Sequence, residues 1–224
     1  MSIKQITQQA EALFQKVFSC SYSKKAYAKL ESFSKMLTKH GISANMITFA
    51  GLFFAVLGLN FLAISGYFFA FLCLVLNRLC DVLDGISARQ HQITPFGAFL
   101  DICSDYTSAG LFILGFILAN PDNNATSGAF LLVALLIAGA ALLGFAVISG
   151  QSYQDLNSSK SKICMWGALQ NADIFAALFL MCIFSGLFMQ IALFFGLFLI
   201  GKSLLVVSNA YYTLEIAAKD KKSK

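Results

Sequence analysis

The chain has 224 residues, of which 58% are hydrophobic and 12% are charged, and its formal net charge is +5. This composition is typical of an integral membrane protein and excludes an ordinary soluble domain. The six cysteines form no Cys-x-x-Cys pair and only two histidines are present. We therefore interpret the cysteines as small buried residues rather than as disulfide or zinc sites, and we expect no nucleic-acid partner.

The first 40 residues predict two amphipathic helices. Apolar residues recur at helical spacing within residues 2–19 and again from Ala26 to Leu37, where lysines flank the stripe. Such helices either lie in the membrane interface against anionic headgroups or pack on the cytoplasmic face of the protein itself. The same region lacks the compact apolar core of a cleavable signal sequence, so none is expected.

Six apolar segments follow, each long enough to cross about 30 Å of hydrocarbon. They cover residues 45–64, 67–84, 97–119, 127–149, 168–187 and 189–212. Breaks are expected at Ser65-Gly66 and Ser185-Gly186, and the run Asn-Pro-Asp-Asn-Asn-Ala-Thr at 120–126 predicts a turn. We therefore expect an all-α bundle of six transmembrane helices over residues 41–214, followed by a basic tail at 215–224.

Small residues predict where these helices approach closely. Gly51 and Gly58 lie in the first segment, and the run 138–141 (Ala-Gly-Ala-Ala) with Gly144 lies in the fourth. Small faces of this kind let membrane helices pack at short distance. Packing within one chain is favoured here over a dimer interface.

The distribution of basic residues predicts the orientation in the membrane. Seven lysines precede the first segment, and four more lie within residues 219–224. Arg78 and Arg89 flank the loop after the second segment, and Lys160 and Lys162 follow the fourth. The loops at 65–66, 120–126 and 185–190 contain none. The positive-inside rule therefore places both termini, and the loop after the second segment, in the cytoplasm.

Four aspartates lie at the ends of the second and third apolar segments, where charge is costly. An ionised carboxylate placed centrally in a membrane helix costs about 3 kcal/mol, so four of them need cations, and divalent metal is the simplest choice. Helical geometry places Asp81 and Asp84 within roughly 60° of each other, together with Asn77 and Ala88. On the next helix the same face carries Gly97, Asp101, Asp105 and Ser108. A short loop joins the two helices, so both carboxylate pairs are expected at one membrane face.

The run from Asp81 to Asp105 reads D-x2-D-G-x2-A-R-x7-G-x3-D-x3-D. This pattern resembles the signature of the CDP-alcohol phosphatidyltransferase (phosphotransferase) family, class I, at all eight positions. Upstream, Asn45-Met-Ile-Thr48 is similar to the family's P-N-x-x-T entry to its first membrane helix, with Ala44 in place of the proline. The resemblance implies a membrane enzyme that releases CMP from a CDP-linked donor, and members of the family tend to be homodimers.

The resemblance also implies roles for the signature residues. Asp81, Asp84 and Asp101 would bind Mg²⁺ or Mn²⁺, two ions being expected, and Asp105 would complete the metal site and act as general base for the acceptor hydroxyl. The nucleotide and its phosphates would contact Asp84 and the residues Gly85, Ala88, Arg89 and Gly97. Arginine suits bidentate phosphate binding. A purely structural ion-pair cluster is disfavoured, because only Arg78 and Arg89 lie near four acids.

Candidate acceptor-binding residues carry less information. Lys202 lies inside the sixth segment, where a lysine either binds an anionic group such as an acceptor phosphate or pairs with Asp173 near the start of the fifth. Asp173, in the polar group with Gln170 and Asn171, lies toward the same side of the membrane and is itself a candidate to line the acceptor pocket. Lys160 and Lys162 either bind an anionic acceptor or only supply positive-inside charge. His91 is expected to point to water, because Asp105 is better placed as a base.

The preferred interpretation is transfer of a phosphatidyl group from CDP-diacylglycerol to a hydroxyl acceptor in phospholipid biosynthesis, in a bacterial inner membrane with the site on the cytoplasmic side. An alternative donor is a CDP-linked head group such as CDP-choline, CDP-ethanolamine or a CDP-polyol, with a lipid alcohol as acceptor. A small cation transporter is a rival from another class. It predicts polar residues near the bilayer midplane on several helices, whereas here the acids cluster at one face.

Overall fold

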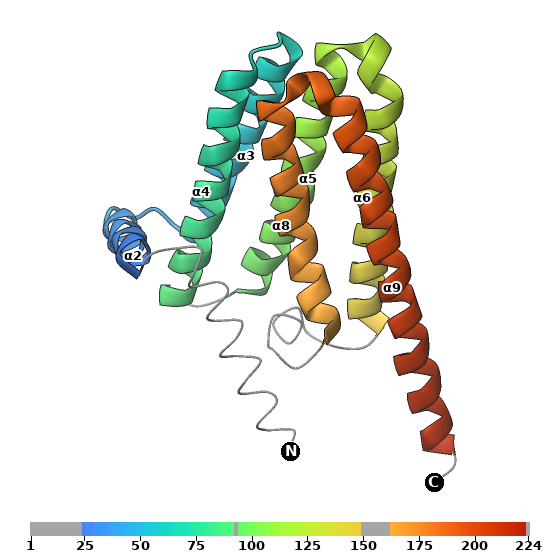
Figure 1. Cartoon of the computed structure of the whole chain (residues 1–224). Coiled ribbons are helices and arrows are strands. Elements are labelled where there is room, and N and C mark those ends of the chain that lie inside the picture. Colours follow the sequence, from blue (N-terminus) through green and yellow to red (C-terminus); the bar gives the residue numbers. More distant parts are fainter. Residues whose placement is uncertain (1–23, 92–93, 149–161, 223–224) are drawn as a thin grey trace. The chain divides into compact units, whose positions relative to one another are not determined.

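The computed structural model describes residues 24–91, 94–148 and 162–222, and every regular element in these ranges is helical (Figure 1). The chain divides into two compact units, Met1–Ala119 and Asn120–Lys224. The first unit contains α2 (Lys24–Lys39), α3 (Ala44–Ala63), α4 (Tyr67–His91) and α5 (Pro95–Ala119). The second contains α6 (Pro121–Ile148), α8 (Lys162–Ile183), the 3₁₀ helix η1 (Ser185–Leu187) and α9 (Phe188–Lys222).

Each of the six predicted apolar segments overlaps one long helix. Within the described residues, four stretches are long and apolar enough to cross a membrane: Ala44–Ala63, Pro95–Ala119, Pro121–Phe145 and Ser185–Ser208. Helix α4 is not among these four stretches, and it contains charged residues such as Arg78 and Asp81. The described apolar stretch of α8, Asp173–Ile183, is shorter than a full span. The all-α prediction is confirmed, whereas six spans stay a prediction.

Glycines on α3 allow this helix to contact both α4 and α5. A Cβ atom at Gly58 would lie 2.4 Å from Cε1 of Phe112 on α5 and 3.4 Å from Cβ of Cys73 on α4. A Cβ atom at Gly51 would lie 3.2 Å from Cβ of Cys80 on α4. At Gly58 an added Cβ atom would force Phe112 to shift, and at Gly51 it would be tighter than an ordinary contact, so both glycines lie at close helix–helix packing. The predicted intramolecular role of Gly51 and Gly58 is therefore confirmed.

A tight turn separates α3 from α4 where Ser65-Gly66 predicted a break. Ser65 adopts a positive φ of 60°, and the Gly66 backbone N–H donates to the carbonyl oxygen of Phe61 at 2.7 Å. This bond satisfies a carbonyl that the end of the helix would otherwise leave unpaired. Helix α4 can therefore begin at Tyr67, almost directly after α3.

The turn predicted over residues 120–126 is wrong in extent. Helix α6 begins at Pro121, and the backbone N–H of Asn124 already donates to the carbonyl oxygen of Asn120 at 2.9 Å. Proline is well suited to the first helical position, because it has no N–H group to leave unpaired there. The turn is thus confined to Asn120, and the following polar residues form the first turns of α6.

In the second unit, α9 packs against α6 and α8. A Cβ atom at Gly196 of α9 would lie 2.5 Å from Cε1 of Phe130 on α6, so these two helices are in close contact. Of the small residues predicted on α6, Ala138 is buried, but a Cβ atom at Gly144 would meet nothing within 4 Å. The predicted break at Ser185-Gly186 is confirmed as η1.

Helix α2 confirms the second predicted amphipathic stripe, whereas residues 2–19 lie outside the described residues. It contacts α4 and buries Ser34 completely, while Phe33 and Met36 remain 44% and 49% exposed. Part of its surface thus packs on the protein, and part of its apolar stripe does not. The sequence left open whether this helix lies in the membrane interface or packs on the protein itself, and the structure is compatible with both at once.

Candidate active site

Three of the four signature aspartates come together between α4 and α5. One carboxylate oxygen from each of Asp81, Asp84 and Asp101 lies within 4.8 Å of the other two. Asp84 is buried, and the other two are partly exposed. Three carboxylates at this separation repel one another unless a cation lies among them, and oxygen ligands suit Mg²⁺ or Mn²⁺. The donor set therefore fits a divalent metal.

The fourth signature aspartate, Asp105, lies against an arginine instead. Its Oδ1 atom accepts a hydrogen bond from Nη1 of Arg78 at 3.0 Å. The same Nη1 atom lies 3.4 Å from Oδ2 of Asp81. Arg78 thus links the two aspartates, one on its own helix and one on α5. The sequence indicates that Arg78 lies near the four acids, but it does not indicate which of them the arginine contacts.

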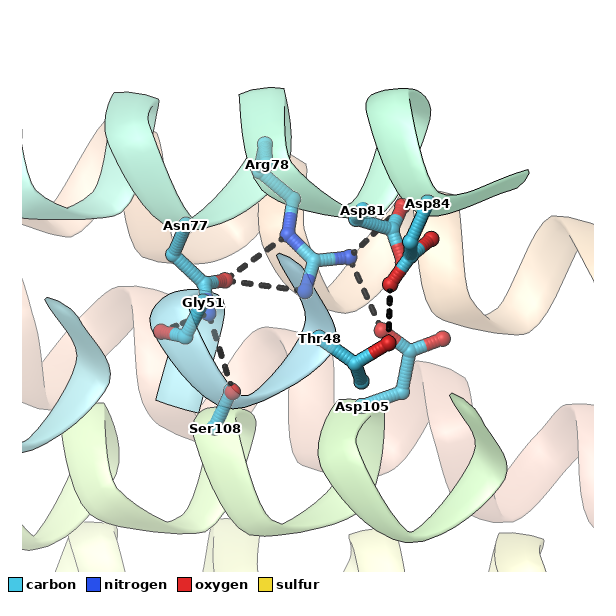
Figure 2. A network of polar contacts seen from close by, with 8 residues as sticks. All are labelled: Thr48, Gly51, Asn77, Arg78, Asp81, Asp84, Asp105 and Ser108. Carbon is cyan, nitrogen blue, oxygen red and sulfur yellow. Dashed lines mark hydrogen bonds and ion pairs between the residues drawn. The ribbon is translucent and has the colours of Figure 1, made fainter. Parts of the chain in front are cut away.

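Asn77 holds this arginine in place, as Figure 2 shows. Its Oδ1 atom accepts hydrogen bonds from Nε and Nη2 of Arg78, at 3.0 and 2.8 Å. Its Nδ2 atom donates to the carbonyl oxygen of Gly51 on α3 at 2.9 Å and to Oγ of Ser108 on α5 at 3.1 Å. One buried amide therefore joins three helices beside the aspartates and also orients the guanidinium group.

Thr48 of α3 forms a hydrogen bond with Asp84 of α4. Its hydroxyl group donates to Oδ2 of Asp84 at 2.6 Å, and both residues are buried (Figure 2). The sequence placed Thr48 in a motif but assigned that motif only to the start of the helix. The start is in fact capped by Ser43, whose Oγ accepts from the backbone N–H of Met46. The spacing of the motif could have suggested a polar contact, but not its partner.

The remaining signature residues surround the aspartates. Arg89 is exposed, and its Nε donates to the carbonyl oxygen of Gly85 one turn earlier at 2.9 Å. At Gly97, the backbone N–H donates to Oγ1 of Thr94 at 3.0 Å, which caps the start of α5. A Cβ atom at Gly97 would lie 3.5 Å from Oδ1 of Asn45, so the start of α3 is close by. Ala88 is half-buried on α4.

The candidate acceptor residues that the structure describes belong to the second unit. Nζ of Lys202 on α9 lies 2.5 Å from Oδ2 of Asp173 on α8 and 5.5 Å from the centre of the Phe198 ring. Lys202 is buried. The sequence left open whether Lys202 binds an anionic acceptor group or pairs with Asp173, and the structure contains the ion pair. Lys160 lies outside the described residues, as do the side chains of Lys162 and His91.

Comparison with known proteins gives matches over most of the chain. The family model described as CDP-alcohol phosphatidyltransferase matches residues 41–199. Inner membrane protein YnjF of Escherichia coli (strain K12) is 34% identical over 183 residues, which are 81% of this chain and 89% of that protein. An uncharacterized protein of Aquifex aeolicus (strain VF5) is 42% identical over 83 residues, 37% of this chain and 42% of that protein. No solved structure gives a significant match.

Proposed function

This chain belongs to the CDP-alcohol phosphatidyltransferase family, and from that premise we propose that it transfers a phosphatidyl group from CDP-diacylglycerol to a hydroxyl acceptor, with release of CMP. The observation that carries the proposal is the group formed by Asp81, Asp84 and Asp101, whose oxygens lie within 4.8 Å of one another. The group lies in a membrane protein, where a lipid-linked nucleotide has its tail in the bilayer and its head outside it.

The three carboxylates would hold Mg²⁺ or Mn²⁺. When bound, such an ion neutralises negative charge on the pyrophosphate and on the leaving CMP. Thr48 would fix the orientation of Asp84, because its hydroxyl group donates a hydrogen bond to one carboxylate oxygen. The other carboxylate oxygen is then free of this bond and could bind the metal ion. This arrangement supports a metal site that is shaped before substrate binds.

The transfer itself is a displacement at the phosphatidyl phosphorus. The acceptor oxygen forms a bond to that phosphorus, the bond from phosphorus to the CMP oxygen breaks, and CMP leaves as an anion. We assign the carboxylate of Asp105 to accept the proton of the acceptor hydroxyl. We assign Arg89, which is exposed on α4, to bind phosphate beside Gly85. This is supported by the open space at Gly85: apart from the helix's own backbone, the described residue that approaches an added Cβ atom there is Arg89, with Nη2 at 3.5 Å.

The distribution of lysine and arginine supports a cytoplasmic site with both termini on the same side. A cytoplasmic site would give the donor's cytidine head and a water-soluble acceptor direct access to the carboxylates. The chain's similarity to an inner membrane protein is consistent with a bacterial inner membrane. The homodimer that the family resemblance implies is part of the same proposal.

The test is CMP release by the full chain purified in detergent, with CDP-diacylglycerol, Mg²⁺ or Mn²⁺, and single acceptors in turn. Glycerol 3-phosphate, serine, inositol and inositol phosphate cover the polar alcohols. Asp84→Asn should abolish release. Asp122→Asn is the matched control, because Asp122 is an exposed aspartate of α6 outside the three-carboxylate group.

Metal-dependent CMP release with one acceptor, lost in Asp84→Asn and kept in Asp122→Asn, supports the proposal and identifies the product. Release from CDP-choline, CDP-ethanolamine or a CDP-polyol with a lipid alcohol, and none from CDP-diacylglycerol, would reverse the assignment of the donor. Absence of release with every donor and acceptor would reject phosphatidyl transfer.

A further inference from the structure

Two neighbouring side chains of α4 form hydrogen bonds directly to α5 beside the carboxylate cluster. Nδ2 of Asn77 donates to Oγ of Ser108 at 3.1 Å, and Nη1 of Arg78 donates to Oδ1 of Asp105 at 3.0 Å. Arg78 has 19% of its side chain exposed. An arginine within a membrane protein is expensive and marks a functional site by default, so its contacts require an explanation.

This polar bridge lies at the end of the cluster that is farther from the connection between α4 and α5. Arg78 precedes Asp81 by one helical turn on α4, and Asp105 follows Asp101 by one turn on α5. The two helices run in opposite directions from their connection (Figure 1). The bridge therefore joins the inner ends of the two carboxylate pairs.

Every nitrogen of the Arg78 guanidinium group has a partner. Nε and Nη2 donate to Oδ1 of Asn77, at 3.0 and 2.8 Å (Figure 2). Nη1 lies 3.0 Å from Oδ1 of Asp105 and 3.4 Å from Oδ2 of Asp81. Because the guanidinium group is planar, its two bonds to Asn77 determine where Nη1 points. Arg78 therefore holds both carboxylates relative to each other and does not select one of them.

Asn77 is itself fixed by the packing of three helices. It is 1% exposed, and its Nδ2 atom donates to the carbonyl oxygen of Gly51 on α3 as well as to Ser108 on α5. Asn77 cannot turn its Oδ1 atom away from Arg78 without losing these bonds. The orientation of the guanidinium group is thus set by the packed bundle.

We propose that Asn77 and Arg78 are positioning residues for the transfer, which set the orientation of the Asp105 carboxylate relative to Asp81. This role rests on the proposed function, in which Asp105 accepts the proton of the acceptor hydroxyl. A metal ion can still bind Asp105, since the bond from Arg78 involves one of its two carboxylate oxygens. A misplaced Asp105 would slow the chemical step and leave donor binding largely unchanged.

The first test is independent of activity. The chain has two arginines, Arg78 and Arg89, so nuclear magnetic resonance of the full chain labelled with ¹⁵N-arginine reports on each guanidinium group. Nη1 and Nη2 give separate signals when rotation about the Nε–Cζ bond is slow, and one averaged signal when it is fast. Arg78 should give separate signals, and the exposed Arg89 should give one. Asn77→Ala should average the signals of Arg78, and Arg89→Lys assigns the spectrum.

The second test measures CMP release with CDP-diacylglycerol and the acceptor that the native chain uses. Asn77→Ala and Arg78→Lys should each lower kcat about tenfold or more, with the donor KM within about threefold of native. Arg78→Lys keeps the charge, so its loss of activity reports the loss of the planar geometry. Asn124→Ala is the matched control for Asn77→Ala, because it removes another buried asparagine, on α6, and should leave kcat unchanged.

One averaged Nη signal for Arg78 in the native chain would overturn the proposal whatever the activity. Native kcat in folded Arg78→Lys would also overturn it, as would an equal loss of kcat in Asn124→Ala. If Asn77→Ala does not fold, Arg78→Lys decides the kinetic test. Separate Nη signals in a native chain that releases no CMP from any donor would reject the proposed function and the catalytic role of the bridge, but not the bridge itself.

Discussion

Thr48 on α3 and Asp84 on α4 are joined by a buried hydrogen bond of 2.6 Å, which connects a helix that carries no signature aspartate to the three-carboxylate group. The bond directs one oxygen of Asp84 toward α3 and fixes the orientation of the other. Residues that orient a metal-binding carboxylate in this way commonly affect metal affinity without touching the metal. Thr48 is therefore expected to act through Asp84.

The first prediction concerns this bond. Thr48→Val keeps the shape of the side chain and removes the hydroxyl group, so Mn²⁺ affinity should fall about 10- to 100-fold. Thr48→Ser keeps the hydroxyl group and should stay close to the native chain. Metal titration of the purified protein measures both. Native affinity in folded Thr48→Val would show that the bond does not orient Asp84.

The second prediction separates Asp105 from its neighbours by function. Asp105→Asn cannot accept a proton, so turnover in the CMP-release assay should fall by about 10²-fold or more. Mn²⁺ binding by the same variant should persist in part, because Asp81, Asp84 and Asp101 still bring their carboxylate oxygens together. Near-normal turnover would remove Asp105 from the role of base.

The third prediction concerns the close packing of α3 against α4 and α5. Gly58→Ala places a Cβ atom 2.4 Å from the ring of Phe112, which must shift, and the free energy of unfolding should fall by about 1–3 kcal/mol. Gly144→Ala has open space and serves as the matched control. Thermal unfolding in detergent should show a lower Tm for Gly58→Ala alone. Equal Tm values would mean that α3 can move away from α5 at no cost.

The sequence predicted the positions of the helices well, because long apolar runs and basic flanks reflect the bilayer rather than details of packing. It also predicted that Asp81, Asp84 and Asp101 meet, since their spacing on two connected helices leaves one shared face. It did not predict the contact of Arg78 with Asp105. That contact depends on Asn77, whose bonds to Gly51 and Ser108 exist only once three helices are packed.

The turn at 120–126 was misplaced for a related reason. Asn, Pro and Asp favour turns and also favour the first turn of a helix, and composition alone does not distinguish the two. The structure resolves the ambiguity at Pro121, which starts α6. Thr48 illustrates the same limit for a side chain, because its partner lies 36 positions away in the sequence.

The fourth prediction addresses the ion pair of the second unit. Lys202→Met leaves Asp173 without its partner, and Asp173→Asn leaves the lysine charge buried in α9. Because Asp173 is 28% exposed, each change should destabilise by about 2 kcal/mol, less than a fully buried pair would. The double variant Lys202→Met with Asp173→Leu should recover part of the loss. Thermal unfolding of the three variants measures it.

The same variants test the acceptor role of Lys202. If the lysine is purely structural, Lys202→Met should lower Tm and leave the KM for the acceptor unchanged. A rise in the acceptor KM of about tenfold, with unchanged donor KM, would instead place an anionic acceptor at this lysine. The Asp173→Asn variant distinguishes the cases, because it keeps the positive charge.

The fifth prediction concerns the surface of α2 that does not pack on α4. Ser34 is buried on the protein, whereas Phe33 and Met36 are exposed on an adjoining face, and Lys35 lies on the opposite side with 59% of its side chain exposed. Helix α2 ends only four residues before α3 begins, and α3 is long and apolar enough to span the bilayer. Its position at the membrane surface therefore follows from the chain connection, and the apolar face is expected to enter the lipid interface.

This orientation can be measured with a single tryptophan. On a Trp166→Phe background, Phe33→Trp in vesicles that contain phosphatidylglycerol should be quenched strongly by brominated lipid, and Lys35→Trp should be quenched much less. The difference is expected because residues 33 and 35 are about 200° apart around a helix, so that only one of them faces the bilayer. Equal quenching would mean that α2 lies away from the membrane and that its exposed apolar face has another role.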